Sequence, residues 1–310
     1  MLSSTAKNLY WMGRYLQRAE NTVRLLEATY RMSLQSPIGD EWRSVPVIYG
    51  RAEDFVAQFP APTLTDLVVY MTFDERNPSS VYNSIQAARN NARAERNNLT
   101  TDVWENINGL WLDLAQIAGQ DRGALDHRGV LEMVKRQAIT VAGAANSTLM
   151  RDDAFNFLSL GNYIERADNT ARILDVKYHI LLPTGEPVGG TLDYYHWSEI
   201  LACIGAFRTY RRVYSNRIEP RRVAELMILH PGVPRSLHFC LRQVDDNLAS
   251  LSDAYGSRGE ANRLAGEITA QLRYGRIDTI FEDGLHEFLT EFVTRTGRLS
   301  TEIGRQFLLD

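Results

Sequence analysis

The sequence predicts an all-α protein, a helical bundle built from two multi-helix halves that are related by a pseudo-twofold axis. Apolar residues recur at helical spacing nearly everywhere, and alternating strand-like runs are almost absent. One long helical segment occurs twice, at a constant shift of 148 residues, and other residues recur at shifts of 155 and 156. The repeat unit is therefore half of the chain, whereas solenoid repeats are only about 20 to 50 residues long.

The repeated segment reads GRYLQRAENTVRLLEATY from Gly13 to Tyr30 and GNYIERADNTARILDVKY from Gly161 to Tyr178. Nine of the eighteen positions are identical, and the polar residues are kept as faithfully as the apolar ones. A duplication explains the common origin of the two copies. It does not explain why the polar identities survived, so these polar residues are the first candidates for a function.

The first helix carries one continuous apolar stripe, formed by Leu9, Met12, Leu16, Ala19, Val23, Leu26 and Tyr30. Its N-cap candidates are Ser3, Ser4 and Thr5, and the breakers Ser36-Pro37 and Gly39 are expected to end it. The same spacing predicts further helices in the first half, near 41–58, 63–72, 79–98, 101–119 and 127–150.

Six more helices are predicted in the second half, near 152–182, 192–215, 219–230, 234–255, 258–274 and 279–308. The loop Leu182–Gly190 contains the strongest breaker residues of either half. The junction between the halves, Met150 to Asp153, lacks the composition of a flexible linker. We therefore expect one domain over residues 1–310, with halves of roughly 1–150 and 151–310, in which the repeated helices face each other.

The composition excludes several classes of protein. A net charge of −4 and a pI near 5.9 favour neither nucleic acid nor an anionic membrane as a partner. The two cysteines, Cys203 and Cys240, form no CxxC motif, so a disulfide framework is not expected. The opening residues do not resemble a signal peptide, and no stretch is apolar enough to span a membrane. We expect a cytoplasmic protein, and the sequence leaves open whether it forms a homo-oligomer.

Metal and cofactor motifs are equally weak. Asp193 to His196 and Asp283 to His286 have the spacing of a helical metal-binding pair, but both lie in one half and lack the longer glutamate. No phosphate-binding GxxxxGK[ST] loop and no GxSxG elbow occurs. The sequence therefore indicates neither a metal nor a cofactor.

A polar face lies opposite the apolar stripe of the repeated helix when its residues are placed at 100° intervals. Glu20 and Asp168 fall at the border of this face. The candidate substrate-binding residues are Arg14, Arg18, Asn21, Arg24, Arg166, Asn169 and Arg172, and the candidate catalytic acids are Glu20, Glu165 and Asp168.

Three interpretations of this face remain open. It could be solvated, with Glu20–Arg24 and Asp168–Arg172 as i, i+4 pairs. It could be a buried network in which Arg18 pairs with Asp168 and Arg166 with Glu20 across the axis. It could also be a binding site in which arginine and asparagine donors hold a carboxylate or phosphate.

The opening, from Met1-Leu2-Ser3 through Asn8 to Tyr15 and on to Arg18-Ala19-Glu20-Asn21, resembles the start of bacterial alpha-E domain proteins. The segments 88–93 and 165–169 are also similar to that family, so the resemblance covers the whole chain. The chain departs from the family pattern at Lys7 and Gln17, where acidic residues are expected. If those carboxylates have a catalytic or metal-binding role, the first copy has lost part of it, whereas the second keeps Glu165.

The resemblance implies a helical protein encoded beside, or fused to, a circularly permuted ATP-grasp protein and a transglutaminase-like peptidase. It also implies a role in making or modifying peptides by ATP-dependent amide ligation. The first hypothesis is therefore an accessory partner of an ATP-grasp amide ligase that binds an anionic peptide group. The alternatives are an enzyme that uses its Glu and Arg residues for acid-base chemistry, and a purely structural scaffold.

Overall fold

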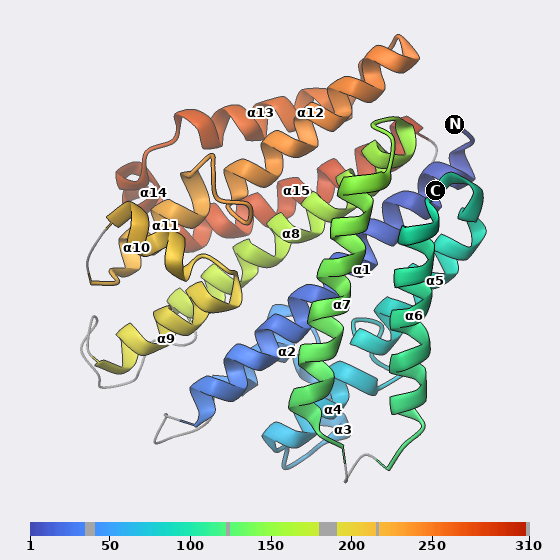
Figure 1. The fold of residues 1–310 in the computed structure, drawn as a ribbon. Coiled ribbons are helices and arrows are strands. Elements are labelled where there is room, and N and C mark those ends of the chain that lie inside the picture. Colours follow the sequence, from blue (N-terminus) through green and yellow to red (C-terminus); the bar gives the residue numbers. More distant parts are fainter. Residues whose placement is uncertain (35–40, 122–124, 180–190, 215–216, 308–310) are drawn as a thin grey trace.

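The computed structural model describes residues 1–34, 41–121, 125–179, 191–214 and 217–307 (Figure 1). Within these ranges the chain forms helices, turns and short connections without a strand, which confirms the all-α prediction. The helices of the first half are α1 (Ser3–Ser33), α2 (Ser44–Ile48), α3 (Ala52–Gln58), α4 (Leu64–Phe73), α5 (Val81–Ala94), α6 (Thr101–Ala118) and α7 (His127–Thr148).

The second half begins with α8 (Asp153–His179), which contains the second copy of the repeated segment. The helices that follow are α9 (Thr191–Cys203), α10 (Phe207–Tyr214), α11 (Pro220–Leu229), α12 (Leu237–Tyr255), α13 (Glu260–Tyr274), α14 (Ile277–Asp283) and α15 (Leu285–Phe307). Short 3-10 turns cover Glu41–Arg43 and Arg96–Asn98.

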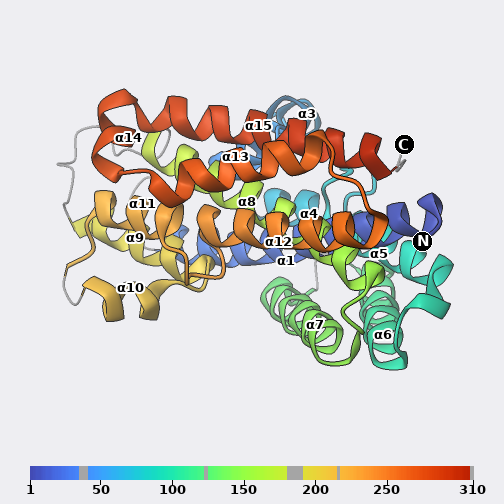
Figure 2. The same ribbon diagram turned by 90° about the horizontal axis from the view of Figure 1, so that it is seen from above.

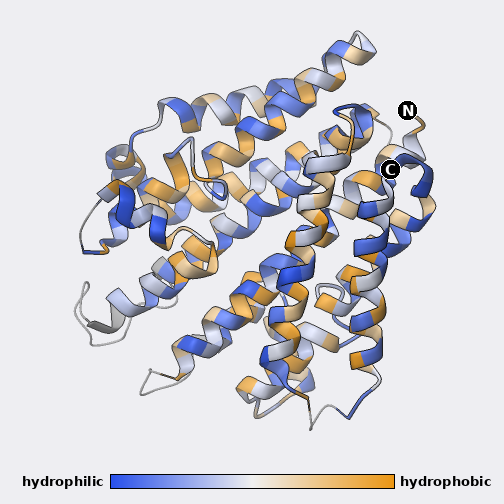
Figure 3. Cartoon of the chain, in the orientation of Figure 1, coloured by the Kyte–Doolittle hydropathy of each residue, from blue (hydrophilic) through white to orange (hydrophobic). Residues whose placement is uncertain are grey.

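Helices α1 and α8 lie side by side in the middle of the molecule and run in the same direction (Figures 1 and 2). Helices α5 and α7 pack on α1, while α12 and α15 pack on α8. The first half also reaches α8 through α2, and the second half reaches α1 through α9. One cluster of buried apolar residues runs through both halves. Figure 3 shows both hydrophobic and hydrophilic residues along most helices, as expected for helices with one face in a core.

The closest approach of α1 and α8 is at two glycines that occupy equivalent positions in the repeat. A Cβ atom at Gly13 would collide with the carbonyl oxygen of Leu158, and one at Gly161 would collide with that of Tyr10. Leu158 and Tyr10 are themselves separated by the repeat shift of 148. The contacts at this crossing are therefore exchanged between the two copies, while the twofold relation of the complete halves stays a prediction.

Three predicted helices are each divided by a glycine with positive φ. Gly50, at φ 62°, separates α2 from α3, and Gly205, at φ 71°, separates α9 from α10. Gly284, at φ 104°, separates α14 from α15. The single helices predicted over 41–58, 192–215 and 279–308 were therefore wrong, because an α-helix cannot continue through a left-handed residue.

The predicted start of the first helix was also wrong. Helix α1 begins at Ser3, and the N-cap position is Leu2, which provides no side-chain hydrogen bond. The predicted stripe is buried except for Tyr30, which is 42% exposed. The predicted breakers Ser36-Pro37 and Gly39 and the loop Leu182–Gly190 lie outside the described residues, as does the predicted end of the helix near 182.

None of the described helices combines the length and the hydropathy needed to cross a bilayer.

We predict that Gly13→Ala and Gly161→Ala each destabilise the protein, because the added methyl group meets backbone rather than a movable side chain. The expected loss in the free energy of unfolding is at least about 1–3 kcal/mol for each variant, measured by chemical denaturation. Gly109→Ala in α6 is the matched control, since nothing lies within 4 Å of its added Cβ. That control should gain up to about 1 kcal/mol from helix propensity. Equal effects at Gly13 and Gly109 would contradict the tight crossing.

Candidate functional site

Just after the glycine crossing along the two helices, the polar faces of α1 and α8 point toward each other rather than into solvent. Glu165 is 5% exposed and accepts hydrogen bonds from two arginines of α1. Arg14 Nε lies 2.6 Å from its Oε2 atom, and Arg18 Nε lies 2.6 Å from Oε1. Arg18 Nη2 adds a bond of 3.1 Å to Oε2. Glu165, the candidate acid of the second copy, is therefore bound by Arg14 and Arg18, two candidate arginines of the first copy.

The electrostatics of this cluster keep all three groups charged. Burial alone would raise the pKa of Glu165, but Arg14 and Arg18 outweigh it and lower that pKa to about 2. Burial likewise opposes the charge on Arg14, yet Glu165 and Tyr10 raise the pKa of its guanidinium above the usual value. Arg14 Nη1 also donates to Tyr10 Oη at 3.2 Å and to Ser300 Oγ at 3.1 Å. The second acceptor, Ser300, comes from α15, so residues of three helices hold this guanidinium.

A cavity of about 550 Å³ opens beside this cluster. We call its polar wall the open cradle, formed by Arg14, Arg18, Ser79, Glu165, Asp168, Asn169 and Arg172. Arg172 Nε donates to Asp168 Oδ2 at 2.8 Å. Asn169 is only 7% exposed and makes no side-chain hydrogen bond within the described ranges. This wall combines firmly paired charges with polar groups that face the cavity.

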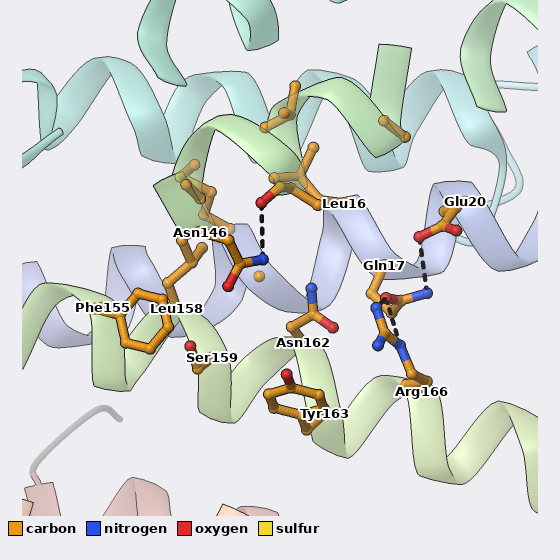
Figure 4. Close-up of a pocket in the computed structure, with 16 residues that line it drawn as sticks. Leu16, Gln17, Glu20, Asn146, Phe155, Leu158, Ser159, Asn162, Tyr163 and Arg166 are labelled. Carbon is orange, nitrogen blue, oxygen red and sulfur yellow. Dashed lines mark hydrogen bonds between the residues drawn. The ribbon is translucent and has the colours of Figure 1, made fainter. Parts of the chain in front are cut away.

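The equivalent polar groups on the other side of α1 and α8 form what we call the closed cradle: Gln17, Glu20, Asn21, Arg24, Arg166 and Arg235. Arg166 donates to Gln17 Oε1 through Nε at 3.0 Å and Nη2 at 2.7 Å (Figure 4). Gln17 Nε2 in turn donates to Glu20 Oε2 at 3.3 Å. Gln17 therefore accepts hydrogen bonds from an arginine of the opposite helix, as Glu165 does in the open cradle.

The cavity beside the closed cradle, shown in Figure 4, measures only about 80 Å³. Its wall from α7 contains Ala138, Val141, Ala142 and Ala145. The wall of the larger cavity from α15 contains Val293, Thr296, Gly297 and Ser300, which are the same four positions shifted by 155. The two cavities are thus built from equivalent positions of the repeat, and they differ in volume.

The structure brings all the predicted site residues to this pair of helices but changes their pairing. Arg18 binds Glu165 instead of Asp168, and Arg166 binds Gln17 through its side chain instead of Glu20. The crossing contacts place residue i of α1 level with about residue i+148 of α8. Arg18 is therefore level with residue 166, so Glu165 lies one residue before that level and Asp168 lies two residues after it, about 3 Å along the axis.

The predicted i, i+4 pairs are both present. Arg24 Nε lies 2.8 Å from Glu20 Oε1, and Arg172 Nε lies 2.8 Å from Asp168 Oδ2. The pair in the closed cradle is largely buried, because the Glu20 side chain is only 8% exposed. The pair in the open cradle is more accessible, with Arg172 41% exposed. A fully solvated face therefore does not describe either helix.

Sequence reasoning missed Arg235 and Ser79, which occupy equivalent positions at a shift of 156. The signal that could have found them is the flanking repeat, in which Pro78 and Ser80 recur as Pro234 and Ser236. Arg235 Nη2 donates to Glu20 Oε1 at 2.6 Å, and its Nη1 donates to Asn21 Oδ1 at 2.8 Å. A residue outside the repeated helix therefore completes the closed cradle.

The described residues provide neither a metal-binding cluster nor an activated cysteine at this site. No cluster of three or more His, Cys, Asp or Glu side chains arranged to hold a metal is found in the described part of the chain. Cys203 and Cys240 are free and buried, and burial raises the pKa of each thiol to about 11. A thiol with such a pKa is protonated at neutral pH and is a weak nucleophile.

The Alpha-E family profile, described as a predicted alpha-helical domain with a conserved ER motif, matches residues 1–308. The chain belongs to the Alpha-E family. This confirms the family that the opening residues indicate. The chain contains three Glu-Arg dipeptides, at 75–76, 95–96 and 165–166. Glu165-Arg166 is the one at the crossing, where each residue binds the opposite helix.

This Alpha-E chain is similar to uncharacterised proteins of Mycobacterium bovis and of Mycobacterium tuberculosis. Each is 26% identical over 92% of this chain. The chain spans about a third of the length of these relatives, 34% in each case. No solved structure matches it.

We predict that Glu165→Gln destabilises the protein at neutral pH by about 3–5 kcal/mol, because it leaves two buried guanidiniums without their carboxylate. A lowered native pKa gives stability that is present above pH 4.5 and is lost as the pH falls toward about 2. The variant should therefore show a weaker decline in the free energy of unfolding across that window, measured by denaturation at several pH values.

Asp54→Asn is the control for this prediction, because Asp54 is 62% exposed in its pair with Arg51. It should change stability by less than about 1 kcal/mol. A Glu165→Gln variant with the acid sensitivity of the unmodified protein would show that the Arg14–Glu165–Arg18 cluster does not contribute as described.

Proposed function

We propose that this Alpha-E chain is a helical binding partner of an ATP-grasp amide ligase and that its open cradle holds an anionic group of the peptide being ligated. The observation that carries the proposal is an excess of arginine around an accessible cavity. Arg14, Arg18 and Arg172 line it, against the two carboxylates of Glu165 and Asp168. One positive charge is therefore uncompensated at the cavity wall.

These arginines also have donors left to use. Arg14 Nη2, Arg18 Nη1 and both Nη atoms of Arg172 donate no hydrogen bond to the described part of the chain. Guanidinium groups bind carboxylate and phosphate oxygens through paired N–H donors. A peptide carboxylate or an acyl phosphate, the groups used in ATP-dependent amide ligation, has the charge and size for such a site.

The alternative of an enzyme with acid-base residues finds less support in the geometry. Glu165 has both oxygens bonded to arginines, and a pKa of about 2 makes it a poor proton carrier at neutral pH. Arg235 and Arg24, against the effect of burial, lower the pKa of Glu20, which lies in the closed cradle. Asp168 lines the larger cavity together with Glu165, and it is already paired with Arg172.

The scaffold alternative is favoured by the closed cradle, where paired side chains leave little space. It does not account for the open cradle, where equivalent positions surround a cavity of about 550 Å³. The lengths of the mycobacterial relatives fit a partner role, because about two thirds of each lies outside the region that matches this chain. A domain joined to other segments can present a bound peptide to them.

The direct test is amide ligation by the ATP-grasp protein of the same organism, with and without this chain. We predict that Arg172→Ala raises the KM for peptide about 10- to 100-fold in the mixture, the equivalent of one or two charge-assisted hydrogen bonds. Stability should fall by less than about 1 kcal/mol, because Arg172 is 41% exposed. Arg305→Ala, at an exposed pair with Glu302, is the matched control and should leave KM unchanged.

An unchanged KM in the Arg172→Ala mixture would refute anion binding at the open cradle. Conversion of the peptide by the purified chain, without the ATP-grasp protein, would instead establish the enzyme alternative.

A further inference from the structure

The closed cradle shows how this scaffold holds a guanidinium group, because one from its own chain is bound there. Arg235 is 9% exposed, and its two Nη atoms bond Glu20 and Asn21 at 2.6 and 2.8 Å. Glu20 also binds Arg24, so one carboxylate holds two guanidiniums. Burial lowers the pKa of Arg235 to about 10, and the group stays charged at neutral pH. The closed cradle therefore holds a planar cation of its own chain.

The backbone that carries Arg235 has an equivalent in the first half. Ser80 and Ser236 are the N-cap residues of α5 and α12, and each accepts a hydrogen bond from the backbone N–H three residues later. The turns before them also match, since Ser80 N donates to Asn77 O at 2.9 Å and Ser236 N donates to Val233 O at 2.9 Å. Ser79 therefore takes the position of Arg235, and it lines the larger cavity.

The partners of the missing guanidinium are present in the open cradle. Asp168 and Asn169 are the equivalents of Glu20 and Asn21 at the repeat shift of 148. Asp168 uses Oδ2 for Arg172, while Oδ1 has no partner within the described ranges. Asn169 is 7% exposed and lines the cavity, and its side chain makes no hydrogen bond within the described ranges. No atom of Asn169 is among the buried polar atoms that lack a partner, so its amide reaches the cavity and can bond a ligand there.

We propose that the open cradle binds a ligand that carries a guanidinium group, which lies over Asp168 and Asn169 in the position that Arg235 occupies in the closed cradle. This inference rests on the proposed function and names its substrate class, a peptide that ends in an arginine residue. The arginine side chain occupies the Asp168–Asn169 corner, and the terminal carboxylate meets Arg14, Arg18 and Arg172. A cavity of about 550 Å³ is within the usual size range of small-ligand sites.

The balance of charge agrees with this ligand. The closed cradle holds Arg24, Arg166 and Arg235 against Glu20, a net charge of +2. The open cradle holds three arginines against two carboxylates, a net charge of +1. One bound guanidinium brings the open cradle to the same +2, and the carboxylate of the ligand returns it to +1. The scaffold already tolerates the charge that binding creates.

Three probes separate the two groups of the ligand, with affinities measured by NMR titration of the full chain. Nα-acetyl-L-arginine has both groups, its amide lacks the carboxylate, and Nα-acetyl-L-citrulline has a neutral urea of the same shape. We expect acetyl-arginine to bind at least about tenfold more tightly than acetyl-citrulline. Equal affinities of these two would overturn the guanidinium site. Equal affinities of acetyl-arginine and its amide would contradict the proposed anion site and leave the guanidinium site supported.

Ser79→Arg places the side chain of the closed cradle in the open one. We expect this variant to lose binding of acetyl-arginine at least tenfold, with its melting transition intact. Asp168→Asn, a smaller change, should remove the preference for arginine over citrulline even if Ser79→Arg does not fold. Binding at unmodified affinity by folded Ser79→Arg, or an undiminished preference in Asp168→Asn, would refute the assignment.

Discussion

The close approach of α1 and α8 is the constraint on which the rest of the structure depends. Two glycines at equivalent positions of the repeat let each helix backbone touch the other, and either methyl group would collide with a carbonyl oxygen. Long side chains just beyond the crossing must then share a narrow space between the helices. Arginines and their acceptors fill it, because buried charges are tolerated only when paired and hydrogen-bonded. The polar identities of the repeat thus follow from the packing of its two smallest residues.

Duplication produced two cradles from one pattern, and the two have diverged in what fills them. Gln17 stands where the second copy has Glu165, and its amide oxygen accepts hydrogen bonds from Arg166. Arg235 stands where the first half has Ser79, and it fills the space beside Glu20 and Asn21. One cradle therefore stabilises the helix pair, whereas the other keeps a cavity. The closed cradle matches the structural interpretation of the polar face, and the proposed binding role concerns the open cradle on the other side of the crossing.

This division bears on function in the Alpha-E family, because the Glu-Arg pair at 165–166 contributes one residue to each cradle. Glu165 orients Arg14 and Arg18 at the open cradle, and Arg166 joins the helices at the closed one. A carboxylate used in this way positions donors for a ligand and has little capacity to transfer protons. This geometry supports the proposed role in recognition, in which the proposed ligase partner would carry out bond formation.

Much of the architecture could be read from the sequence alone. Helical periodicity determined the all-α class, and the internal repeat identified α1 and α8 as the central pair and supplied every candidate of the polar face. Periodicity could not locate Gly50, Gly205 and Gly284 as breaks, because an apolar pattern continues across a left-handed residue. Only the tertiary structure decided that Arg18 meets Glu165 and that Arg235 reaches Glu20. Both contacts depend on the register and separation of elements far apart in the chain, and packing at Gly13 and Gly161 sets that register.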